Sequence, residues 1–342
     1  MKNNSYIYFC VLLLGLFCSC SNRPKYDLFT NFTWDDFGKP QFLQGELVNF
    51  DEMLMNPTRI WVVDSFLVTK NSNLDKSFYV YNLNTRKKVG ERIVRGNGPQ
   101  EMLDPVLVRL SDDNLAVLDK QMKRMDMYQK HVFFESESPL PFKSNPVKEL
   151  LMNPVLVPNL GFVSATFESD RKLVAYDFDG NLISYFGNYP EGYEDAPVLN
   201  KFTWFDHDFA VHSDGSCFVA AHKRTDMLEF YDKDLMMFRR IQGPDNFYPP
   251  TERNMEFRPG YFFPVATDDC FYVLYDGRVY NQNSPERYLQ RNLLVFDWEG
   301  KPLKHYQLSE GIIHFALDEK NRVIYGVSDY PDFHIVSFPL SN

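Results

Sequence analysis

The sequence predicts an all-β protein that folds as a six-bladed β-propeller with four antiparallel strands in each blade. Three observations lead to this prediction. Phe and Tyr are abundant, with 31 and 20 residues among 342, and runs with alternating apolar residues recur along the chain, as is typical of β-strands. A similar segment of about 45 residues occurs six times, as in known propeller repeats. Prolines open three of these segments at the same position.

The landmark of each segment is a short strand that ends in an aromatic residue. The six landmark residues are Tyr81, Tyr128, Tyr176, Phe230, Phe296 and Phe338. Most landmarks are preceded by an alternating strand after a polar turn, and each except the last is followed by a further strand. The predicted following strands are 87–94, 131–138, 181–187, 235–241 and 302–308. The landmark strand and the strand after it therefore form a hairpin in the first five units.

A further strand opens each unit. Pro57, Pro105 and Pro154 follow Asn or Asp in three units, and Arg258-Pro259-Gly260 is predicted to occupy the same position in the fifth. Proline has no N–H to donate, so it suits the first residue of a strand. A β-sandwich with a second domain is the alternative fold, but it does not explain the common position of these prolines.

The last unit ends after its third strand, so its fourth strand must come from elsewhere. Residues 41–48 precede the first opening strand and are predicted to complete the last blade, which removes the free edge of the ring. The predicted propeller therefore spans residues 41–342, and residues 20–40 are predicted to be a tether.

The first 20 residues predict a signal for export and lipidation. Lys2 precedes an apolar run at 6–17, which is too short to span a bilayer and suits a signal peptide over 1–19. Ser19-Cys20 resembles a bacterial lipobox, which implies lipid attachment at Cys20 and membrane anchoring without a transmembrane helix. The alternative is ordinary cleavage nearby, giving a soluble secreted protein.

Composition excludes two classes of partner. The chain has 36 basic and 46 acidic residues, and loss of Lys2 with the signal leaves a net charge of 35 minus 46, or −11. This charge argues against binding of nucleic acid and of anionic lipid surfaces. After removal of the signal and lipidation only Cys217 and Cys270 remain, so the protein is not a disulfide scaffold.

The turn Gly96-Asn97-Gly98-Pro99-Gln100-Glu101 follows the first predicted blade. It lacks the third glycine and the following helix of a dinucleotide-binding loop. With the lipobox and the aromatic-ended repeats, it resembles the TolB-like six-bladed β-propeller lipoproteins of the Bacteroidetes, although Met102 stands where a larger apolar residue is expected. The resemblance implies the architecture and little chemistry. Arg95 and Glu101 flank the bend and are candidate binding residues.

One face of the predicted ring carries longer connections than the other. Loops from fourth strands to the next blade share a face with loops between second and third strands. We define this as the long-loop face, and its long segments are 188–208, 243–261 and 276–291. Its candidate binding residues are Tyr193, Trp204, Tyr248 and Tyr280, because aromatic side chains stack on sugars and partner surfaces. The alternative is that they pack on the blades beneath.

Polar residues that precede the opening strands are predicted to surround the channel mouth. These residues are Asn56, Asp104, Asn153, Asp206, His207 and Arg258. The alternative is that Asn and Asp before Pro only favour the turn. Some six-bladed propellers are calcium-dependent lactonases or esterases, and this similarity makes Asn56, Asp104, Asn153 and Asp206 candidate Ca²⁺ ligands; no other cofactor is expected. No catalytic base or G-x-S-x-G motif is identifiable.

Together these features predict a lipid-anchored cell-envelope protein that binds a glycan, a peptide or a protein partner through the long-loop face. The alternative is a divalent-cation-dependent hydrolase, lactonase or lyase with its metal in the channel. Residues 21–25 lack the acidic run that resembles a surface-export signal, so the predicted location is the outer membrane, facing the periplasm.

Overall fold

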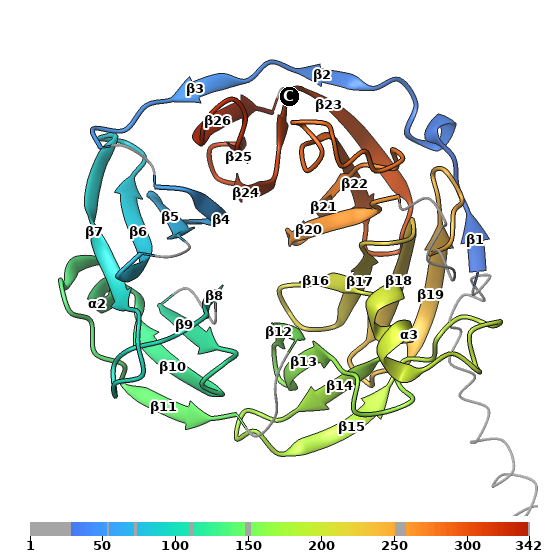
Figure 1. Ribbon diagram of the computed structural model, residues 1–342, viewed down its shortest axis with the longest axis horizontal. Helices are drawn as coiled ribbons and strands as arrows, with labels where there is room; N and C mark the ends of the chain where they lie inside the picture. The colour runs from blue at the N-terminus through green and yellow to red at the C-terminus, as the bar shows by residue number, and fades with distance from the viewer. Residues whose placement is uncertain are drawn as a thin grey trace, which may run out of the picture.

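The computed structural model describes residues 29–52, 55–71, 74–109, 113–147, 152–249 and 258–340. Within these residues six β-sheets stand around a central axis like the blades of a propeller (Figure 1). The predicted six-bladed fold is confirmed, with the first strand of each blade nearest the axis and the fourth at the rim.

The first three blades each consist of four consecutive strands. Blade 1 contains β4 (Pro57–Val63), β5 (Phe66–Asn71), β6 (Lys76–Asn82) and β7 (Lys87–Val94). Blade 2 contains β8 (Pro105–Arg109), β9 (Asn114–Asp119), β10 (Arg124–Gln129) and β11 (Lys143–Pro146). Blade 3 contains β12 (Met152–Val157), β13 (Gly161–Ala165), β14 (Leu173–Tyr176) and β15 (Leu182–Phe186).

The other three blades also take strands from the N-terminal segment. Blade 4 contains β16 (His207–Val211), β17 (Cys217–His222), β18 (Met227–Asp232) and β19 (Met237–Gln242). Blade 5 contains β20 (Tyr261–Ala266), β21 (Cys270–Tyr275), β22 (Gln290–Asp297) and β23 (Pro302–Ile312). Blade 6 contains β24 (His314–Asp318), β25 (Val323–Ser328) and β26 (His334–Pro339), completed by β3 (Glu46–Val48).

The ring closes as predicted, by a strand from the N-terminal end of the propeller. Strand β3 pairs antiparallel with β26, with Val48 opposite Ile335. Strand β2 (Gln41–Leu43) was expected to belong to the same blade, but it pairs parallel with β23 of blade 5. Residues 41–48 therefore bridge the outer edges of two blades.

The segment before β2 also lies on the ring. Strand β1 (Phe29–Asn31) pairs parallel with β19 of blade 4, and the 3₁₀-helix η1 (Trp34–Phe37) follows it. Phe32 is buried and its ring lies 5.4 Å from that of Phe296. Residues 29–40, predicted as tether, thus run along the rim of the ring (blue in Figure 1). The predicted signal peptide and Cys20 lie outside the described residues.

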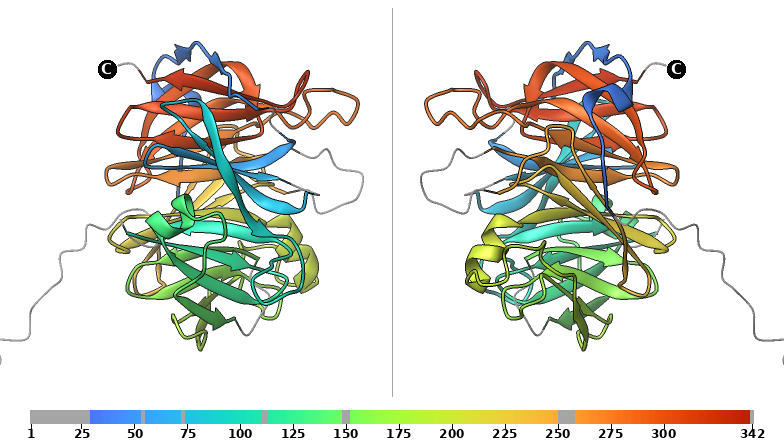
Figure 2. Two further views of the ribbon diagram at one scale, coloured as in Figure 1. Left: turned by 90° about the vertical axis from the view of Figure 1, so that its left-hand side faces the viewer. Right: turned by 90° about the vertical axis from the view of Figure 1, so that its right-hand side faces the viewer.

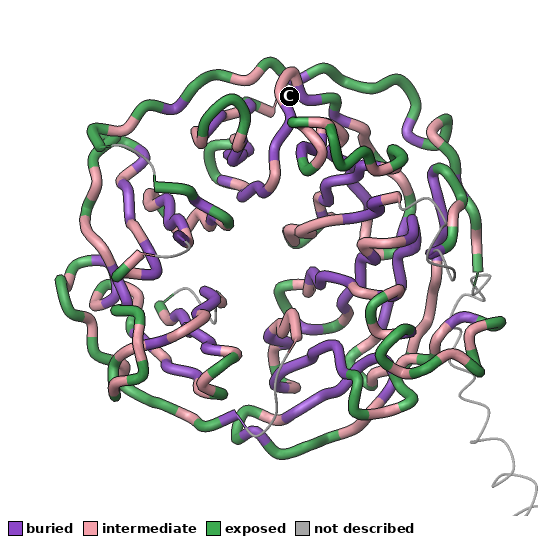
Figure 3. The backbone as a smooth tube through the Cα atoms, in the orientation of Figure 1, coloured by how far each residue is buried: buried purple, intermediate pink, exposed green. Residues whose placement is uncertain are grey.

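The hydrophobic core is divided among the contacts between neighbouring blades. Each of six apolar clusters joins residues of two adjacent blades. Figure 3 shows burial concentrated in the middle of the blades and exposure at the rim. All six landmark aromatic residues lie in third strands and are buried. The aromatic landmark is therefore the residue that each blade buries against its neighbour.

The segment 131–138, predicted as the outer strand of blade 2, forms the helix α2 (Lys130–Glu135) instead, and the outer strand is β11. The side chain of Arg92 in β7 donates hydrogen bonds to the carbonyl oxygens of Phe133 and Phe134, both at 2.5 Å. These contacts supply donors to carbonyl groups in the last turn of α2, to which no N–H group of the helix donates.

In three blades a left-handed residue is followed by proline and by a register shift in the opening strand. The left-handed residues are Asn56, Asn153 and Phe263, in blades 1, 3 and 5. The residue pair in blade 5 is therefore Phe263-Pro264, and the expectation that Arg258-Pro259 takes this position is wrong. Arg258 precedes β20, three residues before its first residue.

The helices α2 and α3 (Val198–Trp204) are short. Across the described part of the chain no helix combines the length and the apolar character that crossing a membrane requires.

Candidate functional site

The long-loop face is formed as the sequence predicts. The connection from β15 to β16 contains α3, and the connection from β21 to β22 spans residues 276–289. Figure 2 shows both projecting from the same side of the ring, whereas α2 lies on the opposite side. We call this opposite side the short-turn face, because hairpins such as 233–236 connect its strands.

Two of the predicted aromatic residues pack on the blades. The ring of Tyr193 lies 4.9 Å from that of Phe205 and 6.0 Å from that of Trp204, which ends α3. Phe205 is fully buried, and both Tyr193 and Trp204 are half-buried. This cluster therefore holds α3 against the ring.

The other two predicted aromatic residues are more available to a partner. Tyr248 is 59% exposed, and Tyr280 donates a hydrogen bond of 3.2 Å to the hydroxyl of Tyr288, which is 52% exposed. The guanidinium of Arg287 lies 4.8 Å from the centre of the Tyr288 ring. The loop 276–289 thus presents a tyrosine pair stiffened by an arginine. Tyr288 lies in the predicted long segment 276–291 but was not among the predicted binding residues.

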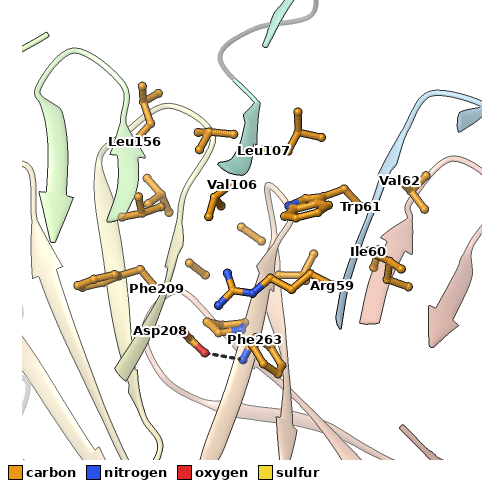
Figure 4. A pocket seen from close by; sticks show the side chains of 18 of the residues that line it. Arg59, Ile60, Trp61, Val62, Val106, Leu107, Leu156, Asp208, Phe209 and Phe263 are labelled. Atoms are coloured by element: carbon orange, nitrogen blue, oxygen red, sulfur yellow. Dashed lines mark hydrogen bonds between the residues drawn. The ribbon is translucent and has the colours of Figure 1, made fainter. Parts of the chain in front are cut away.

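A cavity of about 390 Å³ lies at the centre of the ring. The first strands of all six blades line it, and all but seven of its lining residues are apolar. Figure 4 shows Trp61, Val106, Leu107, Leu156 and Phe209 around this space, with Arg59 pointing into it. The cavity size is in the range of small-molecule sites, about 300–1,000 Å³.

Asp104, one of the predicted mouth residues, is held between two lysines. Its carboxylate pairs with Lys70 and, at 3.1 Å, with Lys120. Burial alone would raise the pKa of the Asp104 carboxyl, but the two ammonium groups outweigh it and lower the pKa. Asp104 is therefore an ionised carboxylate that is already neutralised.

Asn153 and Asp206 also come together at the mouth. The amide of Asn153 donates to the Asp206 carboxylate at 3.0 Å and to the carbonyl oxygen of His207 at 2.9 Å. Lys223 lies 3.3 Å from Asp206 and 3.0 Å from Asp208. Burial would lower the pKa of Lys223, but these carboxylates outweigh it and raise the pKa. Asp206 and Asp208 are therefore both paired with Lys223.

The geometry of these residues does not suit a calcium ion. Ammonium groups lie beside Asp104 and Asp206, in places where a cation would be repelled. Asn56 is exposed. Among the described residues no group of three or more His, Cys, Asp or Glu side chains could hold a metal ion.

Arg59, the arginine among the lining residues of the cavity, was not predicted from the sequence. It is the second residue after Pro57, where Leu107 and Leu156 stand after Pro105 and Pro154. All three line the cavity. A charged residue at a position where two other repeats have leucine is therefore the feature of the sequence that could have indicated this site.

The family model described as TolB-like 6-blade propeller-like matches residues 36–320 of the sequence. The chain belongs to this TolB-like propeller family. Comparison with curated protein sequences gave no match.

Two solved structures resemble this TolB-like propeller in fold. One is a protein described as exported, from Bacteroides fragilis, with a TM-score of 0.54 and 12% identity over 91% of this chain and 98% of that one. The other is a member of the DUF4221 family from Bacteroides vulgatus, with a TM-score of 0.56 and 9% identity over 89% and 97% of the two chains. These identities show a shared fold alone.

The glycine turn of this TolB-like propeller is closed by its own glutamate. The Glu101 carboxylate accepts a hydrogen bond of 2.8 Å from the N–H of Gly98, and Arg124 donates to the carbonyl oxygens of Pro99 and Glu101 at 3.0 and 2.8 Å. Glu101 therefore stabilises the turn.

Arg95 lines a second, polar cavity of about 280 Å³ together with Lys70 and Asp104.

His207, predicted at the mouth, is buried inside the ring instead. Its Nδ1 atom lies 2.8 Å from the carbonyl oxygen of Phe205, and its ring lies 5.3 Å from that of His222. Burial lowers the pKa of both histidines, that of His222 to about 3. The first strand alternates its side chains, so His207 faces the neighbouring strands while Asp208 lines the cavity.

Next to these histidines Glu229 is the centre of a buried ionic cluster. It pairs with Lys172, accepts from Tyr231 at 3.1 Å and lies 2.7 Å from the Arg240 guanidinium. Glu229 and Lys172 are both buried. Burial would raise the pKa of Glu229, but the Lys172 charge and the other contacts lower it well below its usual range. The cluster fastens blade 3 to blade 4.

Proposed function

We propose that the protein is a lipid-anchored binding module of the cell envelope that recognises a glycan, peptide or protein partner through the long-loop face. The observation that carries this proposal is the exposed tyrosine set on long loops over a rigid ring, with Tyr248 and Tyr288 59% and 52% exposed. Aromatic side chains on loops of a rigid scaffold are frequent binding determinants.

The direction of β1 supports an orientation for this module. Strand β1 runs parallel to β19, which starts after the hairpin 233–236 and leads into the long connection that begins at 243. The chain therefore reaches Phe29 from the side of the short-turn face. Phe29 is nine positions after Cys20, a reach of about 30 Å when the chain is extended. A lipid on Cys20 would hold the short-turn face toward the membrane and turn the long-loop face outward.

The envelope location rests on the sequence and on the related folds. The apolar run 6–17 followed by Cys20 favours export and lipidation. The similar Bacteroides fragilis structure is of a protein described as exported. We therefore assign the protein to the envelope as an outer-membrane lipoprotein that faces the periplasm.

Shortening the loop tests the partner surface. Residues 277–289 are replaced by a two-residue turn between β21 and β22, and the full lipidated chain is used to capture partners from its own envelope. Loss of specific capture with unchanged thermal unfolding supports the proposal. The matched control is Met236→Ser on the short-turn face, which should leave capture intact. Capture that survives the shortening excludes this loop as the site.

A further inference from the structure

The central cavity has an apolar wall and a charged side chain inside it. Lining residues from all six first strands enclose about 390 Å³. Trp61, Leu107, Leu156 and Phe209 form part of the wall, and Arg59 extends into the space between them (Figure 4). An arginine in such surroundings is costly unless an anion or water accepts its hydrogen bonds.

Arg59 differs from the other cations that line this cavity. Lys120 pairs with Asp104 at 3.1 Å, and Lys130 pairs with Asp64 at 2.8 Å. Across the described residues, the guanidinium of Arg59 has neither a hydrogen-bond partner nor an ion-pair partner. The guanidinium lies 5.6 Å from the centre of the Phe263 ring. The Phe263 ring supports the charge from one side.

Among the described residues, the nearby Asp208 carboxylate makes no hydrogen bond or ion pair with Arg59. One oxygen of Asp208 lies 3.0 Å from Lys223, and the other accepts from the main-chain N–H of Phe263 at 3.2 Å. His314, also in the cavity wall, uses Nδ1 to accept from the N–H of Ile60 at 3.4 Å. Asp208 and His314 therefore make these contacts with groups other than Arg59. The Arg59 guanidinium is left to bind an incoming anion.

The surroundings select one class of anion. A guanidinium binds a carboxylate through two parallel hydrogen bonds, and the single negative charge of a monocarboxylate matches the single charge of Arg59. The apolar wall offers few partners for the hydroxyls of a glycan or the amides of a peptide, and burying such groups without partners is unfavourable. A ligand with an apolar body and a single carboxylate can bind the Arg59 guanidinium and pack against the apolar wall.

We propose that the channel cavity binds a small amphipathic monocarboxylate, with its carboxylate on Arg59 and its apolar body against the wall around Trp61. This site is separate from the partner surface on the long loops. Shortening of residues 277–289 therefore leaves carboxylate binding unchanged, so either proposal can fail without the other.

Isothermal titration of the mature protein with octanoate and with its neutral amide, octanamide, tests the proposal. The wild-type protein should bind octanoate at least about tenfold more tightly than octanamide, as expected for a charge-assisted hydrogen bond. Arg59→Gln should abolish this preference, and Arg59→Lys should keep part of it. Lys233→Gln, which removes an exposed charge on the short-turn face, should have no effect. Thermal unfolding verifies that each variant is folded.

Three results would overturn the proposal. They are no measurable binding of octanoate to the wild-type protein, equal affinity for octanoate and octanamide, and octanoate binding that persists in folded Arg59→Gln. A tripeptide ending in leucine that binds more tightly than octanoate would show that the occupant is a peptide terminus instead, and would equally contradict it.

Discussion

The carboxylate of Asp208 accepts a hydrogen bond of 3.2 Å from the main-chain N–H of Phe263. This contact joins β16 of blade 4 to β20 of blade 5 at the bulge where Phe263 adopts a left-handed conformation, with φ of 51°. The same carboxylate neutralises Lys223 at 3.0 Å. Asp208 therefore shapes the backbone that carries Phe263 beneath Arg59.

Asp208→Asn should destabilise the protein by about 1–3 kcal/mol, because it removes a buried charge-assisted interaction and leaves Lys223 with Asp206 alone. Denaturant unfolding with linear extrapolation measures the change. An unfolding free energy equal to that of the wild type would show that the Asp208 contacts contribute nothing to stability.

The pH dependence of stability should report the buried His314. Burial, with the charge of Arg59, lowers its pKa to about 3, while the nearby Asp208 acts in the opposite direction. In the unfolded chain its pKa is about 6.5. Between about pH 6.5 and pH 3, His314 is therefore protonated in the unfolded chain and neutral in the folded protein. Stability from this group is complete above pH 6.5 and falls as the pH drops toward 3.

His314→Asn should flatten this dependence. The advantage of the wild type over the variant in unfolding free energy is expected to shrink by up to about 1.4 kcal/mol per pH unit between pH 6.5 and pH 3. Denaturant unfolding of both proteins at a series of pH values gives this difference. A difference that is constant across the range would mean that His314 titrates normally in the folded state.

The ionic cluster at Glu229 should be a sensitive point of the ring. Glu229→Gln leaves the buried Lys172 without its counter-charge, and breaking such a pair costs about 3–5 kcal/mol. The exposed pair Lys233–Asp234, with side chains 70% and 58% exposed, is the control, and Asp234→Asn should change stability by less than about 0.5 kcal/mol. Similar effects of the two substitutions in denaturant unfolding would contradict the assigned importance of the cluster.

The glycine turn makes a coupled prediction. A Cβ atom on Gly96 would lie 2.0 Å from a carboxylate oxygen of Glu101, which holds the N–H of Gly98. Gly96→Ala must therefore displace the Glu101 side chain and lose that hydrogen bond, a cost of about 1 kcal/mol. Once Glu101→Ala is present, the same glycine substitution should cost less. A double-mutant cycle with additive effects would show that the two residues are independent.

The repeat structure was readable from the sequence because each blade satisfies the same packing requirement. Landmark residues such as Tyr81 and Phe296 are buried in third strands where predicted. The long-loop face followed from strand order alone. These features depend on local periodicity and chain length, which one sequence displays directly.

The errors occurred where a distant contact decides the local structure. Residues 131–135 alternate enough to be read as a strand, but Arg92 from the neighbouring blade stabilises a helix end there. Blade 5 contains two candidate prolines, and the choice of Pro264 over Pro259 depends on the bulge at Phe263. The parallel pairing of β1 with β19 joins residues more than 200 positions apart, which no local pattern encodes.

The candidate site was predicted in composition but not in arrangement. Asn153 contacts Asp206 and lines the central cavity, but lysines neutralise the carboxylates of Asp104 and Asp206. Whether a residue such as Arg59 lacks a partner depends on every side chain around it. Sequence spacing therefore indicates where polar groups gather, and only the packed ring shows which of them stays free.

Site-specific photo-crosslinking in the envelope tests the central claim, that the long-loop face binds a partner, most directly. A photoreactive residue is placed at Tyr288 on the long-loop face and, as a matched control, at Met236 on the short-turn face; the native side chains are 52% and 64% exposed. We predict a discrete crosslinked adduct from position 288 and none from position 236. Adducts from position 236 alone, or the same adducts from both positions, would contradict the claim.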